Sequence, residues 1–130
     1  MTQPITSHRT AGGIAVITAP ASFDIYTAPE VRDLTIQLQR DGATVIVIDL
    51  GAVTFMDSTA LGLIAAAHKR LTSAGGTLAV AGASEPVTRM FRVTGLTRLI
   101  PMHPTTGDAI RQASTGKRVN DARDSGGAGR

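Results

Sequence analysis

The residues best placed to do chemistry are Asp57 and Ser58, because they stand where a strand pattern changes to a helix pattern. Residues 45–50 form an apolar, β-branched run of strand length. After the pair, residues recur at helical spacing: Leu61, Ile64, His68 and Leu71. Asp57 is a good N-cap, since its carboxylate can accept a hydrogen bond from a free N–H of the first turn. A helix is therefore predicted to begin at Ser58, which places its hydroxyl at the positive end of the helix dipole.

A helix N-terminus with a hydroxyl beside it suits an anion, because the first backbone N–H groups of a helix have no partner inside it. A phosphate on Ser58 would add roughly −1.5 to −2 charges and three acceptor oxygens, which the dipole at a helix start tolerates. Thr59 offers a second hydroxyl one residue further into the turn. A plainer interpretation stays open from these residues alone: Asp57 only caps the helix, and Ser58 is an ordinary helix-start serine.

Hydrolytic or metal chemistry has much less support in the sequence. The segment around Ser58 lacks the Gly-x-Ser-x-Gly pattern of a nucleophile elbow. A general base would have to be one of three histidines: His8, His68 or His103. Of these, His68 lies about 15 Å along the same helix, and the three are too scattered for a metal site. Gly75-Gly76 also lacks the Lys-Ser/Thr that ends a phosphate-binding loop. We therefore expect no catalytic residue, no metal and no cofactor.

Composition points to a single globular domain inside the cell. The 130-residue chain is 42% hydrophobic and 18% charged, and its lack of cysteine excludes disulfides and suits a reducing compartment. We find no signal-peptide pattern and no apolar run of membrane-spanning length, so a cytoplasmic protein is expected. The pI is about 10.2, yet residues 1–114 carry nine Lys/Arg against eight Asp/Glu. Without a concentrated basic patch, neither direct nucleic-acid binding nor membrane binding is expected.

Strand and helix patterns alternate along the chain. We expect strands at residues 5–9, 13–18, 44–50, 78–81 and 99–102. Helices should begin after an N-cap at Thr27, at Ser58, after Pro86 and at Thr105 or Thr106, and end near Arg40, Ala74, Gly95 and Ala113. This order predicts an α/β fold: a mixed, mostly parallel sheet with an N-terminal hairpin at its edge and about four helices, mainly on one side. Residues 1–114 would form the domain, and residues 115–130 a disordered tail.

A family resemblance is carried by residues 55–62, Phe-Met-Asp-Ser-Thr-Ala-Leu-Gly. They resemble the signature of bacterial anti-sigma factor antagonists, the single-domain STAS proteins. The resemblance extends roughly from residue 13 to residue 113 and includes Phe23-Asp24, residues 74–76 and residues 91–96. Two departures stand out: Ala60 replaces a usual Gly, and Ala21-Ser22 replaces a frequent Gly-Glu. The second removes an acidic residue from the loop that usually flanks the phosphorylated serine.

The resemblance implies a regulatory binding protein and not an enzyme. In the family, the serine after the Asp is phosphorylated by a partner kinase, which places that role on Ser58. The chain would bind an anti-sigma factor of the serine-kinase type and release the sigma factor; a serine phosphatase would reverse the modification. Partner-binding residues would lie around the serine: Asp24, Asp57, Ser58, Thr59, Leu61 and Gly62. Two alternatives stay open: a STAS component of a larger stress-signalling assembly, or a small nucleotide-binding or nucleotide-hydrolysing protein.

Overall fold

A five-stranded sheet forms the centre of the computed structural model, which describes residues 5–114. The strands are β1 (Thr6–Thr10), β2 (Ile14–Thr18), β4 (Val45–Asp49), β6 (Thr77–Ala81) and β7 (Met102–His103), in the order β1-β2-β4-β6-β7. The first pair is an antiparallel hairpin and every other pair is parallel. Its turn uses Gly12 and Gly13 at φ near +80°, a conformation that favours glycine. The mixed, mostly parallel sheet predicted from the sequence is confirmed.

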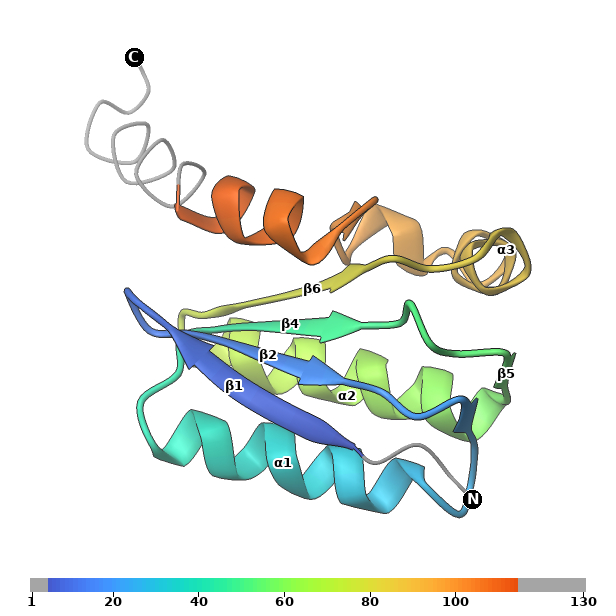
Figure 1. Cartoon of the computed structure of the whole chain (residues 1–130), viewed down its shortest axis with the longest axis horizontal. Helices are drawn as coiled ribbons and strands as arrows, with labels where there is room; N and C mark the ends of the chain where they lie inside the picture. Colours follow the sequence, from blue (N-terminus) through green and yellow to red (C-terminus); the bar gives the residue numbers. More distant parts are fainter. Residues whose placement is uncertain (1–4, 115–130) are drawn as a thin grey trace.

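Helices α1 (Ala28–Arg40) and α2 (Ser58–Ser73) cover one face of this sheet, and α3 (Glu85–Val93) follows β6 (Figure 1). Alternate residues of the central strands point to that face and pack into a single core: Ala15, Ile17, Ile46, Ile48, Leu78 and Val80. Phe91 of α3 and Ile64 of α2 complete it. Because the strands of a parallel sheet are covered on both sides, the first four residues of β2 and of β4 are all apolar instead of alternating with polar residues.

The opposite face of the sheet is covered by a last helix at residues 106–114 (Figure 1). A second cluster forms there from the remaining strand residues: Ile14, Val16, Val45, Val47 and Ala81. Ala109 of the last helix packs into it. The α/β class is thus confirmed, with α1 and α2 on one face and the final helix on the other. No helix within residues 5–114 is both long and apolar enough to cross a membrane. The predicted disordered tail, residues 115–130, lies outside the described residues.

The last strand is displaced from its predicted position. Residues 99–102 were expected to be extended, but a 3₁₀ helix occupies Leu96–Arg98, and the Ile100 N–H still donates to the Leu96 carbonyl. Pro101 has no N–H to give to a ladder, although its carbonyl accepts the Val80 N–H at 3.0 Å. Pairing with β6 therefore begins at Pro101 and continues into the two-residue β7, at the edge of the sheet.

A second, much smaller sheet was not predicted. It pairs β3 (Ser22–Phe23) with β5 (Phe55–Met56) in parallel. Phe23 and Met56 face the core, whereas Phe55 is exposed. This pair brings the loop before α1 beside the start of α2, two segments that lie more than 30 residues apart in the chain.

Candidate functional site

Asp57 makes the cap that its sequence position predicts. It is extended, at φ −108° and ψ −179°, and its Oδ1 accepts the Ala60 N–H at 3.0 Å, so α2 begins at Ser58. Met56 and Leu61, on either side of the cap at the positions of a hydrophobic staple, are both buried. The local sequence therefore fixes where the helix starts and which hydroxyls flank its free N–H groups.

The same carboxylate also reaches across to the loop before α1. Its Oδ2 accepts the backbone N–H of Ile25 at 3.1 Å, a contact between residues 32 positions apart. One side chain thus holds the start of α2 and the loop between β3 and α1 in a fixed relation. Of these two structural roles of Asp57, only the helix cap was predicted from the sequence.

Asp24 organises that loop from within. Its Oδ1 accepts the N–H groups of Tyr26 at 3.0 Å and Thr27 at 3.2 Å, and its Oδ2 accepts the Ser22 hydroxyl at 2.9 Å. Partial burial acts to raise the pKa of the Asp24 carboxyl, but the hydrogen bonds from Ser22, Tyr26 and Thr27 outweigh it and hold the pKa below its ordinary value. Asp24 is therefore an ionised anchor of the loop.

Thr27 stands at the predicted N-cap of α1 without capping the helix through its side chain. Its hydroxyl donates instead to the Ser22 carbonyl at 2.8 Å and accepts the Asp24 N–H at 2.9 Å. The loop competes successfully for this hydroxyl, because the first turn of α1 already contains Pro29, which has no N–H to satisfy. Ser22, Asp24 and Thr27 thus form one hydrogen-bonded unit.

The structure brings the six candidate partner-binding residues to one end of α2, though not all to the surface. Ser58, Thr59 and Gly62 are exposed, and Asp24 and Asp57 are half-buried. Leu61 is only 7% exposed and belongs to the core. It therefore supports the surface from below and does not face a partner.

Three exposed apolar residues beside this site were missed by sequence reasoning. Ile25 and Tyr26 lie in the loop that Asp24 organises, and Phe55 lies in β5. Their one sequence signal was that they fall outside the helical and strand periodicities of the core. Phe55 is close to Ser58 in the chain, whereas the contact between the two segments brings Ile25 and Tyr26 next to it.

Comparison with known proteins identifies the family of the chain. The sequence model of the STAS domain matches residues 7–109. The chain belongs to the STAS domain family. A Staphylococcus aureus protein named anti-sigma-B factor antagonist is 36% identical over 88 residues, which are 68% of this chain and 80% of that protein. The family resemblance inferred from residues 55–62 is confirmed.

Solved structures share the same fold. An anti-sigma factor antagonist from Mycobacterium paratuberculosis superposes with a TM-score of 0.74 and 26% identity, covering 88% of this chain and 95% of that one. The Bacillus cell fate determinant SpoIIAA, in its phosphorylated form, gives a TM-score of 0.70 at 20% identity, with 84% and 98% covered. The α/β architecture of this STAS domain is therefore that of the antagonists.

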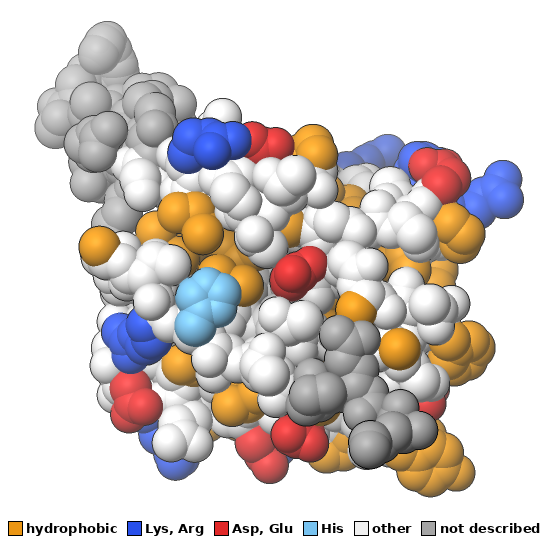
Figure 2. Space-filling view, in the orientation of Figure 1, with side chains coloured by type: hydrophobic (Ala, Val, Ile, Leu, Met, Phe, Trp, Pro, Cys, Tyr) orange, Lys and Arg blue, Asp and Glu red, His pale blue; other side chains and the backbone are white. Residues whose placement is uncertain are grey.

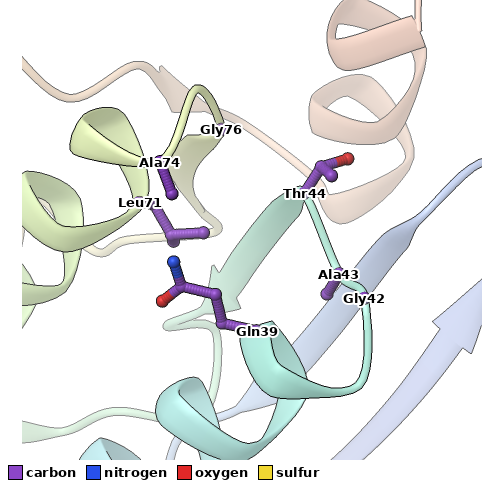
Figure 3. Close-up of a pocket in the computed structure, with 7 residues that line it drawn as sticks. All are labelled: Gln39, Gly42, Ala43, Thr44, Leu71, Ala74 and Gly76. Carbon is purple, nitrogen blue, oxygen red and sulfur yellow. The ribbon is translucent and has the colours of Figure 1, made fainter.

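Two further features of the described residues bear on where chemistry could take place. Within residues 5–114, no three His, Asp or Glu side chains gather as a metal ion would require. A hollow of about 210 Å³ lies between the ends of α1 and α2, where the Gln39 side chain points toward Leu71 (Figure 3). It sits at the far end of the 16-residue α2, roughly 24 Å from Ser58 at the standard helical rise. It is therefore separate from the site described above.

Proposed function

We propose that this STAS domain is an anti-sigma factor antagonist, which binds an anti-sigma factor through the surface around Ser58 and so releases the sigma factor. The observation that carries the proposal is the exposed Ser58 at the first position of α2, directly after Asp57, whose carboxylate binds the loop that Asp24 organises. The name of the Staphylococcus aureus relative, at 36% identity, supports the same role.

Phosphorylation of Ser58 switches this binding off. The partner is an anti-sigma factor with serine-kinase activity, which transfers a phosphoryl group to the Ser58 hydroxyl, and a serine phosphatase removes it. A dianionic phosphate is favourable at a helix N-terminus, so the fold has no reason to change. On the surface, however, it adds charge and bulk next to the Asp57 carboxylate, which expels a partner that binds the neutral hydroxyl. The similar Bacillus SpoIIAA has been solved in a phosphorylated form.

The protein acts by binding and not by catalysis of its own. Ser58 receives a group that the partner activates, and the hydroxyl needs only to be exposed and held at a fixed place. The cap at Asp57 provides that fixed place, because it sets the first residue of α2.

The test is phosphorylation by a candidate anti-sigma factor kinase from the same genome. The protein is incubated with the kinase and radiolabelled ATP, and labelled peptides are mapped. Label is expected in the wild type and in Thr59→Ala, the neighbouring exposed hydroxyl, and should be lost in Ser58→Ala. Full labelling of Ser58→Ala would overturn the assignment of Ser58 as the modified residue. Failure of the unmodified wild type to bind the kinase in a titration would overturn the antagonist role itself.

A further inference from the structure

Exposed apolar side chains are concentrated beside Ser58. Within residues 5–114 five large hydrophobic residues are exposed, and three of them adjoin the site: Ile25 (57%), Tyr26 (89%) and Phe55 (55%). We refer to these three as the apolar rim. Figure 2 shows apolar side chains protruding at the lower right, the corner where Figure 1 places the start of α1. The other two exposed residues, Val93 and Leu99, belong to the end of α3 and the segment after the 3₁₀ helix.

Two contacts make the apolar rim continuous with the Ser58 surface. The Ile25 N–H is bound by Asp57, the residue directly before Ser58. Phe55 pairs with Ser22 across the β3–β5 ladder, and because Phe23 and Met56 of this ladder point into the core, Phe55 points outward. Ile25 and Tyr26 therefore lie one and two residues after Asp24, and Phe55 lies two residues before Asp57.

The loop that carries the rim is held in place before any partner binds. Asp24, Thr27 and Asp57 hold it through hydrogen bonds of 2.8 to 3.2 Å to its backbone and to Ser22. Ile25 and Tyr26 are therefore displayed on a fixed backbone, so binding through them requires little loss of loop entropy. A side chain that is 89% exposed, such as Tyr26, also contributes almost nothing to the domain's own core.

Single exposed apolar residues are normal on protein surfaces, so exposure alone assigns no role. What sets the rim apart is that its three residues lie on two adjoining segments, one of them a held loop. Tyrosine is also enriched among the side chains that dominate interface energy. The neighbours of the rim in the chain and through the Asp57–Ile25 contact are polar or acidic: Ser58, Asp57 and Asp24. This is the composition of an apolar anchor with a polar border.

Building on the proposed function, we infer that the apolar rim is the anchor of the interface. The anti-sigma factor would place an apolar patch of its own on Ile25, Tyr26 and Phe55, and these contacts would supply most of the affinity. Ser58 lies at the border of this water-excluding apolar contact, and its phosphorylation regulates the affinity for the anti-sigma factor. A phosphate introduced there has to be desolvated against an apolar partner surface, which explains how one modification releases a whole interface.

The test is titration of the anti-sigma factor kinase with the full-length protein and four alanine variants, in the absence of ATP. Tyr26→Ala and Phe55→Ala should each weaken binding, Tyr26→Ala by at least ~30-fold, the size of an interface hot spot. Val93→Ala and Leu99→Ala are matched controls, since they remove exposed apolar side chains elsewhere, and they should change the dissociation constant less than ~2-fold. Circular dichroism and thermal midpoints confirm that every variant is folded.

The outcomes separate this inference from the proposed function. If Ser58→Asp loses binding while Tyr26→Ala and Phe55→Ala keep wild-type affinity, the rim is not the anchor and the antagonist role stands. If the wild type does not bind the kinase at all, the antagonist role is wrong and the rim loses its assigned partner. Sedimentation of the protein alone provides the third arm: self-association that Tyr26→Ala abolishes would assign the rim to a second copy of this chain.

Discussion

Replacing Asp57 should destabilise the domain more than the loss of an ordinary helix cap. In Asp57→Ala the Ala60 N–H loses its acceptor, at a cost of about 1 kcal/mol. The Ile25 N–H loses its acceptor as well, and a hydrogen bond to a charged group contributes about 1–1.5 kcal/mol at a half-exposed site. Together these give about 2 kcal/mol of unfolding free energy. For a domain of this size that corresponds to a fall in thermal midpoint of roughly 6–10 °C.

Two further variants separate the contributions. Asn at position 57 has one acceptor oxygen and one donor amide in place of two acceptors, so Asp57→Asn can satisfy the Ala60 or the Ile25 N–H but not both. It should cost about half as much. Ser84→Ala is the matched control, because the Ser84 hydroxyl only caps α3, accepting the Val87 N–H at 3.4 Å, and makes no long-range contact. It should cost about 1 kcal/mol.

The assay is urea unfolding of the three variants, with hydrogen exchange at the Ile25 amide measured alongside. Exchange at Ile25 should quicken in Asp57→Ala and stay at the wild-type rate in Ser84→Ala. If Asp57→Ala costs no more than Ser84→Ala, and Ile25 exchanges as before, then Asp57 acts only as a cap. In that case the loop is held by Asp24 and Thr27 alone, and the reasoning that joins it to α2 fails.

Three further predictions concern binding, packing and pH. Ser58→Asp should bind the anti-sigma factor at least ~10-fold more weakly in a titration, while Ser58→Ala binds like the wild type. Gly76→Ala would place a Cβ 2.4 Å from the Thr44 carbonyl oxygen and should lower the unfolding free energy by more than about 2 kcal/mol in the urea assay. Gly62 lies in open space on α2, so Gly62→Ala should raise the unfolding free energy by about 0.5–1 kcal/mol in the same assay. The pKa of Asp24 is lower in the folded domain than its ordinary value of 3.8. The ionised Asp24 carboxylate therefore stabilises the fold fully at pH values above 3.8, and this contribution is lost as the pH falls through the lowered pKa. A plot of thermal midpoint against pH should therefore be flatter below pH 4 in Asp24→Asn, and parallel curves would contradict this.

Local sequence was enough to predict the elements whose signals are long or chemically specific. The apolar run of β4 indicated a central strand, and the pattern around Asp57 placed the start of α2 at the correct residue. The predicted start of the last strand, residue 99, was wrong because the Ile100 N–H donates to the Leu96 carbonyl of the 3₁₀ helix, so the pairing with β6 begins only at Pro101. The sequence thus predicted the scaffold and the candidate hydroxyl.

What sequence could not predict depends on contacts between distant segments. Each strand of the β3–β5 pair has two residues, which is too short for any periodicity to be visible. The residue types and spacing alone do not bring Ile25 and Tyr26 beside Ser58, and only the family resemblance placed the neighbouring Asp24 there. The helical spacing of Leu61 with Ile64 and Leu71 already indicated that Leu61 faces the core, although the resemblance named it as a partner-binding residue. The candidate residues were named from a resemblance, but which of them form a surface is a property of tertiary structure.

The division of structural roles at the site explains why the switch should act locally. Asp57 provides the acceptor for the Ala60 N–H, so the start of α2 does not depend on the Ser58 side chain. The same carboxylate holds the Ile25 N–H, so the loop before α1 does not depend on Ser58 either. A group added to the Ser58 hydroxyl therefore breaks neither contact and meets free amides of the helix start instead. Amide chemical shifts of Ser58→Asp should change only near the first turn of α2. Changes spread over β2, β4 and β6 would mean that the switch works through the fold, and not through charge at the interface.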